Sequence, residues 1–332
     1  MTLKIDWQQA FKRLQRLKFI AIAFLTCAFI ISCTPVPLNP LRVTCILWLG
    51  YEPLMLARDL GYYDDSGIQV IETEDFGSSV KRFINGDVEM VMMSMDLALE
   101  NVALQDDIRG FLVATFSSGA DAVIVQPEIE TLSDLKGKRI GMLPGTLGQL
   151  VTSRALETVN LTLADVEIVT IDIAQQVAAF ENKEVDALAA FDPVLAQLQT
   201  QGLGNILFDS SQMPGELVDL LIGRASLVDT HERQLQTLLR GWFKALDYIE
   251  TNPDDAIARI AKRENLTPEQ VERTLAQLDF LDLTRMLEIF NKTDTETLSK
   301  MKTTSQFLKE QKILETAIDP ATILEDAPLS QL

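Results

Sequence analysis

The chain is poor in the residues on which most enzyme active sites depend. Its 332 residues include one histidine and three cysteines, and neither a GxxxxGK[ST] nor a GxGxxG segment occurs. With His231 as the only imidazole, a Ser-His-Asp or Cys-His arrangement lacks a base and a zinc site lacks ligands. Without the glycine motifs, the common nucleotide-binding loops have no support, and three cysteines exclude a disulfide framework. We therefore expect no catalytic residue, no cofactor and no metal, and we interpret His231 as a solvated side chain.

Positive charge is also scarce. There are 29 Lys and Arg residues against 48 Asp and Glu, which gives a formal net charge of -19. Such a chain is not suited to nucleic-acid backbones or anionic membrane surfaces, which attract basic patches. The simplest interpretation is an acidic surface that keeps the protein soluble. The 47% hydrophobic content and the length allow a large core and indicate two lobes.

Residues 1–32 have the pattern of a lipoprotein signal peptide. Basic residues up to Lys18 precede an apolar run over 19–31, which is too short for a comfortable membrane span. The run ends at Ser32-Cys33, which resembles the lipobox whose cysteine becomes lipid-modified. Cys27 fits that pattern less well, and an uncleaved anchor helix is the alternative interpretation. We expect a lipid at Cys33, a proline-rich tether over 33–40 and a body on the periplasmic side of the membrane.

From residue 41 the chain alternates strand-like runs with helical stretches. The first series has expected strands at 42–48, 68–72 and 88–93 and helices at 53–61 and 78–85. The second has strands at 137–142, 166–171 and 185–190 and helices at 149–159 and 174–182. This βαβαβ order predicts mostly parallel sheets with helices on both faces. A pattern shared by 83–89 and 180–186, Phe-x-Asn-x-acid-Val-acid, supports two similar lobes.

Beyond residue 232 the sequence changes to amphipathic helices, interrupted at Pro253 and restarted at Pro268. They have no sheet of their own, so we expect them to pack on the first lobe. The predicted division is lobe 1 over 41–116 and 216–332, lobe 2 over 121–208, and hinge crossovers at 117–120 and 209–215.

A set of short motifs resembles the solute-binding lipoproteins of ABC importers of the nitrate/sulfonate/taurine type. The motifs occur in the expected order between about residue 41 and about residue 262, and they are Trp48-x-Gly50-Tyr51-Glu52-Pro53, Ala57-Arg58-Asp59-Leu60-Gly61-Tyr62-Tyr63, Ser118-Gly119-Ala120-Asp121, Leu135-Lys136-Gly137-Lys138-Arg139-Ile140-Gly141, Phe208-Asp209-Ser210-Ser211 and Pro214-Gly215-Glu216. The resemblance implies an α/β, two-lobe periplasmic-binding-protein type II fold with two crossovers and a C-terminal helical extension. It implies a monomeric receptor that delivers a small molecule to a membrane permease, and transport rather than chemistry.

Loops at strand ends supply the candidate ligand-binding residues, because ligands of open parallel sheets bind beyond the carboxyl ends of strands. These loops and the crossovers contain acids and aromatics but no Lys or Arg, and the candidates are Trp48, Tyr51, Glu52, Asp96, Asp121, Thr146, Phe191, Asp192 and Glu216. Carboxylates repel an anion, whereas a buried cation needs opposite charge. Aromatic faces add cation–π contact. The pattern predicts a small nitrogenous cation, namely guanidinium, an amidine or an amine.

The same acids also have structural interpretations. Asp96 and Asp192 stand where helix N-caps occur, and Glu52 stands where it would complement a helix dipole. Glu216 is a candidate partner for Arg224 or a solvated side chain, and Asp121 is a candidate brace of the crossover.

Other functions remain open from the sequence. The first is a receptor for a sulfonate, taurine or nitrate bound through backbone amides near residues 144–148, and the second is a receptor for a pyrimidine-type compound. A lipid-anchored enzyme would use Glu52 and Asp121 as an acid/base pair. A structural envelope protein would bind another protein through its acidic surface.

Overall fold

The structure is a computed structural model that describes residues 39–143 and 147–332. Apart from Asn39, the described residues belong to one compact unit, Pro40–Leu332, which contains its own hydrophobic core. Because this core is complete within the unit, we expect residues 40–332 to fold independently of the preceding segment. The predicted signal peptide, Cys33 and Thr146 lie outside the described residues. Within the described ranges, no helix is long and apolar enough to cross a membrane.

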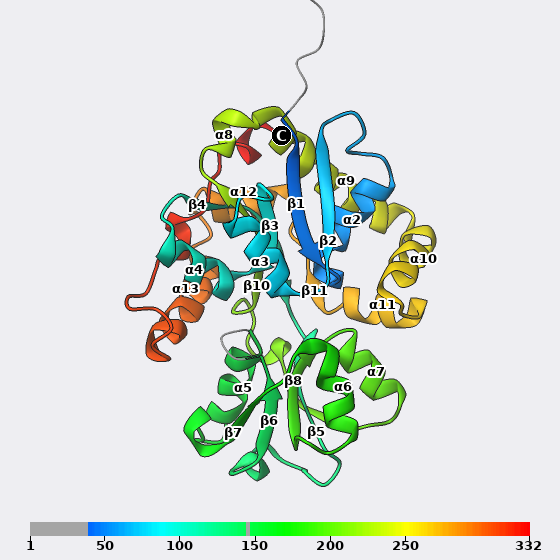
Figure 1. Cartoon of the computed structure of the whole chain (residues 1–332), viewed down its shortest axis with the longest axis vertical. Coiled ribbons are helices and arrows are strands. Elements are labelled where there is room, and N and C mark those ends of the chain that lie inside the picture. Colours follow the sequence, from blue (N-terminus) through cyan, green and yellow to red (C-terminus); the bar gives the residue numbers. More distant parts are fainter. Residues whose placement is uncertain (1–38, 144–146) are drawn as a thin grey trace, which may run out of the picture. The chain divides into compact units, whose positions relative to one another are not determined.

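The first of two sheets has six strands (Figure 1). In spatial order they are β11 (Leu278–Asp279), β4 (Ile108–Ser117), β10 (Val218–Arg224), β3 (Met90–Ser94), β1 (Leu41–Ile46) and β2 (Ile68–Thr73). Strand β1 is parallel to β2 and β3, while β10 runs antiparallel between β3 and β4. Strands β1 and β3 are nearly fully buried, as expected for strands covered on both faces.

The second sheet has five strands and a related order. In spatial order they are β7 (Glu167–Thr170), β6 (Arg139–Met142), β8 (Ala187–Phe191), β5 (Asp121–Val125) and β9 (Asn205–Asp209). Strand β6 is parallel to β7 and β8, and β5 is antiparallel to both β8 and β9. In each sheet an antiparallel strand therefore joins a parallel βαβ unit.

Two chain segments connect the sheets, one from β4 to β5 and one from β9 to β10. The short helix η4 (Ser210–Gln212) lies in the second connection. The Ser210 hydroxyl is 2.8 Å from the Ser117 hydroxyl and accepts a 2.6 Å hydrogen bond from the Gly119 amide. The two connections are thus tied together by side-chain and backbone hydrogen bonds.

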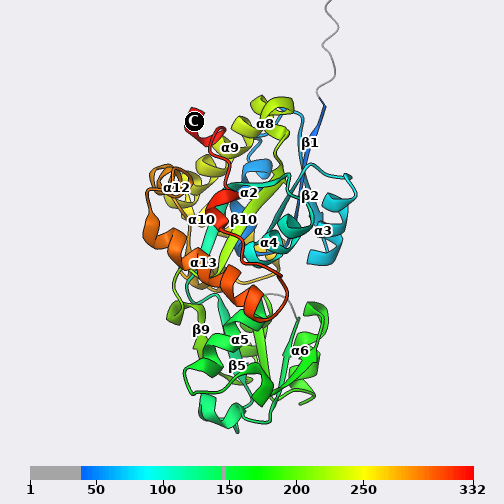
Figure 2. The same cartoon turned by 90° about the vertical axis from the view of Figure 1, so that its left-hand side faces the viewer.

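Helices pack on both sheets. Between the strands lie α2 (Glu52–Asp59), α3 (Phe76–Ile84), α4 (Met95–Leu104), α5 (Leu147–Glu157), α6 (Ile173–Glu181) and α7 (Val194–Thr200). After β10 the chain forms α8 (Leu227–Thr230), α9 (Glu232–Thr251), α10 (Pro253–Glu264), α11 (Pro268–Leu275), α12 (Leu283–Phe290) and α13 (Thr295–Glu310). Helix α9 packs on α2 and α13 packs on α4 (Figures 1 and 2). The C-terminal segment also adds the short strand β11 beside β4, which the helical pattern did not predict.

Some sequence-based expectations were wrong in detail. The first strand ends at Ile46, and a 3-10 helix, η1 (Leu49–Tyr51), follows it. His231 is 4% exposed, and its Nδ1 atom lies 2.9 Å from the Thr230 hydroxyl, so it is a buried residue and not a solvated one. Its place between two helix ends, where the chain turns into the core, explains the burial.

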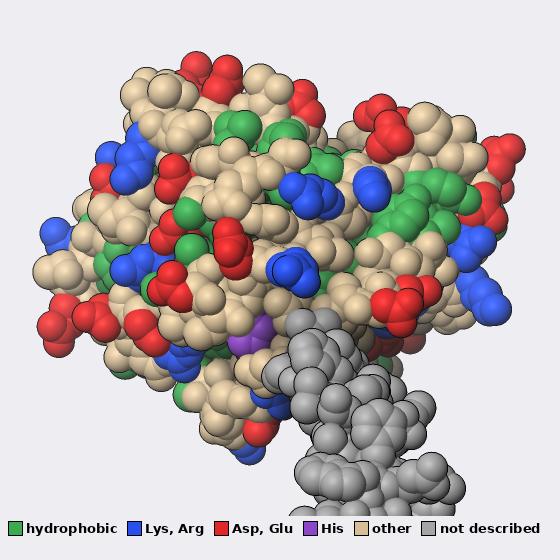
Figure 3. Space-filling model, turned by 90° about the horizontal axis from the view of Figure 1, so that it is seen from above, with side chains coloured by type: hydrophobic (Ala, Val, Ile, Leu, Met, Phe, Trp, Pro, Cys, Tyr) green, Lys and Arg blue, Asp and Glu red, His purple; other side chains and the backbone are tan. Residues whose placement is uncertain are grey.

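The surface carries charges of both signs. Figure 3 shows acidic and basic side chains interspersed on the face that it presents. Elsewhere on the surface, opposite charges form ion pairs, for example Arg139 with Asp186 at 3.0 Å and Lys183 with Glu128 at 3.1 Å. Exposed pairs of this kind contribute little to stability. The excess of acidic over basic side chains is consistent with the expected role in keeping the protein soluble.

Candidate ligand-binding site

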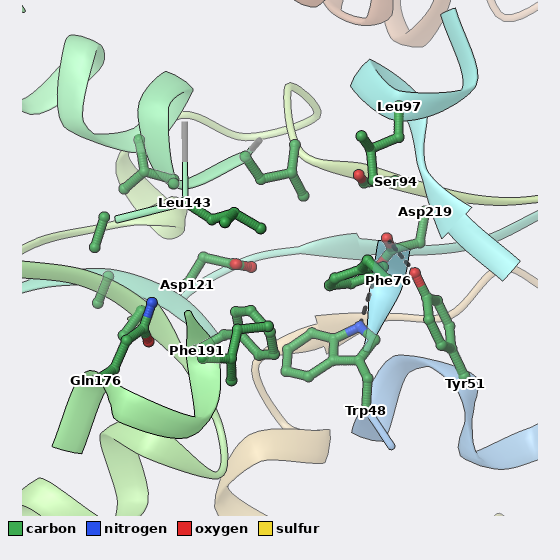
Figure 4. A pocket seen from close by; sticks show the side chains of 17 residues that line it. Trp48, Tyr51, Phe76, Ser94, Leu97, Asp121, Leu143, Gln176, Phe191 and Asp219 are labelled. Carbon is green, nitrogen blue, oxygen red and sulfur yellow. Dashed lines mark hydrogen bonds between the residues drawn. The ribbon is translucent and has the colours of Figure 1, made fainter. Parts of the chain in front are cut away.

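A pocket lies at the carboxyl ends of strands from both sheets (Figure 4). The elements of the first sheet contribute Trp48, Tyr51, Phe76, Ser94, Leu97 and Asp219. Those of the second contribute Asp121, Ala122, Leu143, Leu147, Gly148, Val151, Ile173, Gln176, Ala189, Ala190 and Phe191. The centre of a water molecule can occupy about 60 Å³ of the cavity, which is room for several waters or one compact ligand.

Asp219 organises one wall of the pocket. Its carboxylate accepts a 3.1 Å hydrogen bond from Trp48 Nε1 and a 3.0 Å hydrogen bond from the Tyr51 hydroxyl, as the dashed lines in Figure 4 show. Burial raises the pKa of Asp219 to about 6, although both hydrogen bonds oppose that shift. The strand β10 thus holds the two aromatic side chains that follow β1 in a fixed orientation.

The glycine between these aromatics leaves room for the indole ring. A Cβ atom at Gly50 would lie 2.4 Å from Trp48 Nε1 and 2.9 Å from Thr115 Cγ2, which are distances that no side chain tolerates. The segment Trp48-Leu49-Gly50-Tyr51 therefore needs glycine for close packing of Trp48 over the backbone.

Replacing Gly50 with alanine is expected to displace the Trp48 ring and weaken its hydrogen bond to Asp219. Overpacking of this kind costs about 1–3 kcal/mol of unfolding free energy. Denaturant unfolding and tryptophan fluorescence would measure the two effects. Gly77→Ala is the matched control, because its Cβ would meet only the Asp75 side chain at 3.1 Å. Equal effects of the two substitutions would contradict this explanation.

Phe191 brings the aromatic side chains of the two sheets together. Its ring lies 5.1 Å from that of Trp48, at an interplanar angle of 75°, and 6.4 Å from that of Phe76. These edge-to-face arrangements suit the quadrupoles of the rings. The pocket therefore has an aromatic wall made of residues from η1, α3 and β8.

Asp121, at the start of β5, places a second carboxyl group in the pocket. The residue is 7% exposed, and burial raises the pKa of its carboxyl group to about 7. The nearby Ser117 hydroxyl lowers the pKa, whereas the charge of Asp219 raises it further. In the absence of ligand, Asp121 is therefore only partly ionised at neutral pH.

Gln176 and Ser94 add uncharged polar groups. Gln176 is 3% exposed, and its Oε1 atom has no hydrogen-bond partner among the described residues. In Figure 4 its side chain lies on the same side of the pocket as Asp121. An unpaired buried carbonyl oxygen costs free energy, so a ligand that donates a hydrogen bond would relieve that cost.

Of the predicted site residues, the structure brings Trp48, Tyr51, Asp121 and Phe191 together in the pocket. Asp96 does not line it, but lies buried in the first turn of α4. Neither Asp96 oxygen makes a hydrogen bond of ordinary geometry to another described residue. Burial raises the pKa of Asp96 to about 7 against the lowering effect of Ser94 and the Leu97 amide. Its charge acts on Asp121 through the interior.

The other predicted acids have protein partners outside the pocket lining. Glu52 is 1% exposed and pairs with Arg263 of α10. Glu216 pairs with Arg154 at 2.8 Å, so the prediction that Arg224 is its partner was wrong. Arg224 pairs with Asp107 instead. The Glu52–Asp121 acid/base pair of the enzyme alternative is not assembled in the pocket.

Asp192 links the end of β8 to α11. Its Oδ1 atom accepts a 2.8 Å hydrogen bond from the Ala196 amide, and its Oδ2 atom accepts one from the Thr274 hydroxyl of α11. Asp192 is not among the residues that line the pocket, and its two oxygens bind α11 and the start of α7 instead.

Sequence reasoning missed Asp219, Gln176 and Phe76. Asp219 could have been found, because it is the only charged residue in the apolar run from Leu217 to Gly223. Gln176 and Phe76 lie within ordinary helical patterns and carry no comparable signal. Within the described ranges, no group of three His, Cys, Asp or Glu side chains is placed to hold a metal ion.

Comparison with known proteins identifies relatives. The NMT1/THI5-like family matches residues 49–256. A candidate binding protein of Brucella abortus is 24% identical over 289 residues, which cover 82% of this chain and 88% of that protein. The taurine-binding periplasmic protein of Escherichia coli is 24% identical over 219 residues, or 64% of this chain and 68% of that protein.

The fold also has solved counterparts. The alkanesulfonate-binding protein of Xanthomonas axonopodis pv. citri, bound to MOPS, superposes with a TM-score of 0.72 and 19% identity, over 88% of this chain and 99% of that chain. This likeness confirms the predicted fold class, an α/β periplasmic-binding-protein fold. Since the family match covers more than half of the chain, the chain belongs to the NMT1/THI5-like family.

Proposed function

We propose that the chain is the extracytoplasmic solute-binding component of an ABC importer, and that its ligand is a compact nitrogenous cation such as a guanidinium, an amidine or an amine. Family membership and fold support the receptor role. The ligand class rests on the pocket, where Asp121 and Asp219 supply two carboxyl groups and the described lining residues include no Lys, Arg or His.

The polar groups of the pocket match a donor-rich ligand. Asp121 and Gln176 present acceptor oxygens on one side, and Asp219 presents a carboxylate on the other. A planar guanidinium would donate to these oxygens and stack against Trp48 or Phe191. Hydrogen bonds to these oxygens and the opposite charge of the carboxylates offset the free energy of hydration that the cation loses on binding.

The second candidate is an anion of the kind bound by the relatives, such as taurine or another sulfonate. Its support is similarity alone, because the described lining residues offer it no positive charge. Such a ligand would require Asp121 and Asp219 to be protonated, so that they donate hydrogen bonds instead of repelling it.

Transport requires that the liganded form differ from the free form. We expect the segments 117–120 and 209–215 to act as hinges, and closure of the lobes over the ligand to create the surface that the permease recognises. We also expect export through residues 1–32 and lipid attachment at Cys33, which would hold the body near the permease.

The pH dependence of binding separates the two candidates. A cation binds the ionised carboxyl groups, whose pKa values are about 7 and about 6 in the free protein. The affinity of the cation should fall at least tenfold when the pH is lowered from 7.5 to 5.5, because most of the Asp121 and Asp219 carboxyl groups become protonated over that range. Calorimetry with guanidinium below millimolar concentration, in buffers of different ionisation enthalpy, should show proton release on binding at pH 6.5.

The same titration with taurine, an alkanesulfonate and nitrate provides the contrast. An anion that needs protonated acids would bind more tightly as the pH falls and would take up protons. Tight binding of a sulfonate with that pH dependence, together with no binding of guanidinium, would overturn the cation proposal and leave the receptor role intact.

A further inference from the structure

A second cavity opens beside the ligand pocket and shares residues with it. The centre of a water molecule can occupy about 490 Å³ of this open depression, and Phe76, Leu97 and Leu143 line both cavities. The remaining lining residues come from α3, and they are Gly77, Val80, Lys81, Ile84 and Asn85. We call this second cavity the α3 groove.

Helix α3 has an apolar stripe that the sheet does not use. Ser79 and Phe83 are buried, and Ser79 hydrogen-bonds to strand residues, so this face packs on the sheet. Phe76, Val80 and Ile84 are spaced at four residues and line the α3 groove. The helix is thus apolar on two faces. The second face is only partly covered, because Phe76 meets Phe191 and Val80 is half-buried against the core, whereas Ile84 is exposed.

Ile84 makes the stripe unusual. It is 41% exposed and, with Leu104, is one of two large hydrophobic side chains exposed among the described residues. An exposed isoleucine alone needs no explanation, but this one ends a stripe that begins at Phe76, inside the ligand pocket. From Phe76 to Ile84 the stripe spans about 12 Å along the helix axis.

We propose that the ligand carries an unbranched alkyl chain, which leaves the pocket past Phe76 and lies along Val80 and Ile84 in the α3 groove. This inference rests on the proposed function, since it adds a tail to the cationic head held by Asp121 and Asp219. The class of ligand is an alkyl-substituted guanidine or amine, with a chain of roughly six to eight carbons to match the helix segment.

Charge sets the direction of the ligand. Lys81 lines the groove, and its positive charge would repel a cationic head placed there. The two carboxyl groups lie in the inner pocket. A cation with an apolar tail therefore fits in one orientation, with its head inward and its tail along α3.

Calorimetry on residues 40–332 with a series from methylguanidine to octylguanidine tests the inference. In the wild type, affinity should rise about threefold to fourfold per methylene until the chain fills the groove. Val80→Ser and Ile84→Ser should reduce this gain and leave methylguanidine affinity unchanged. Leu104→Ser is the matched control, because Leu104 is 80% exposed at the end of α4 and lies outside both cavities.

Each outcome decides a separate point. Affinity that does not depend on chain length would overturn the groove and leave the cationic pocket standing. A gain that survives in both serine variants would place the chain elsewhere and also overturn it. If guanidines fail to bind but alkanesulfonates show a gain that Val80→Ser removes, the proposed head is wrong and the groove stands. A concentration-dependent dimer lost in Ile84→Ser, without any chain-length effect, would make the groove a contact between copies and overturn the inference.

Discussion

Replacing Arg263 with methionine is expected to destabilise the protein by about 3–5 kcal/mol, the usual cost of removing one partner from a buried ion pair. The Arg263 guanidinium pairs with Glu52 and, at 2.5 Å, with Asp59, and its side chain is 10% exposed. The substitution would leave Glu52, which is 1% exposed, without its cation. Thermal unfolding should show a decrease in Tm on the order of 10 °C.

The effect should depend on pH with a definite sign. Burial raises the pKa of Glu52 to about 7, although Arg263 opposes this shift, so its loss would raise that pKa further. A carboxyl group whose folded-state pKa is raised loses stability as pH increases, because the unfolded chain ionises first. The difference between wild type and Arg263→Met should therefore be small near pH 5 and largest above pH 8.

A second arginine on the same helix provides the control. Arg259 pairs with Asp255 at 2.6 Å, but both side chains are more than 40% exposed. Arg259→Met should cost less than about 0.5 kcal/mol, as exposed pairs of this spacing do. If the two substitutions were equally mild, Glu52 would not depend on Arg263 for its burial.

Glu264 explains why this cluster is sensitive. It is 4% exposed, and among the described residues neither carboxyl oxygen has a hydrogen-bond partner of ordinary geometry, although the Glu52 carboxyl group lies beside it. Burial raises its pKa, and the neighbouring charge of Glu52 raises it further. Arg263 thus supplies a positive charge to a cluster that would otherwise hold acids alone. One of these acids, Glu52, directly follows the pocket residue Tyr51 in sequence.

The sequence was sufficient to predict the two parallel βαβ units because their signals are local. Alternation of apolar runs with helical spacing identified the strands of the two βαβ units, and the short motifs gave their order. The strand that completes the first sheet was not predictable by the same means, since β10 pairs with β3 and β4 over more than one hundred residues of separation. Only the assembled chain shows which strands are neighbours.

The acids of the site were harder to interpret for the same reason. The sequence predicts that Glu52 and Glu216 lie near strand ends and crossovers, but not that Arg263 and Arg154 reach them from 211 and 62 residues away. Asp121 begins β5 and Asp96 closely follows the end of β3, yet only Asp121 lines the pocket. A count of charges near strand ends therefore overestimates the number available to a ligand, because tertiary ion pairs form between distant segments.

Asparagine at position 121 is expected to stabilise the free protein and to impair binding. Since burial raises the pKa of Asp121 to about 7, folding at pH 8 must keep a carboxylate in an unfavourable environment. Asp121→Asn removes that cost, and the gain should reach about 2–4 kcal/mol at pH 8. The gain should appear as the pH rises from 4 to 7, the range in which the unfolded chain is ionised before the folded one.

The same substitution should lower the affinity for a guanidinium ligand roughly tenfold to one hundredfold, because a charge-assisted hydrogen bond is lost. Asp192→Asn is the matched control. That carboxylate accepts hydrogen bonds from Ala196 and Thr274 through its two oxygens, so an amide there should destabilise the protein. Thermal unfolding across pH and calorimetry with one ligand would measure both effects. A carboxyl group that lowers the stability of the free protein and raises its affinity for ligand serves binding. If Asp121→Asn were less stable than the wild type, or bound guanidinium equally well, Asp121 would instead brace the fold.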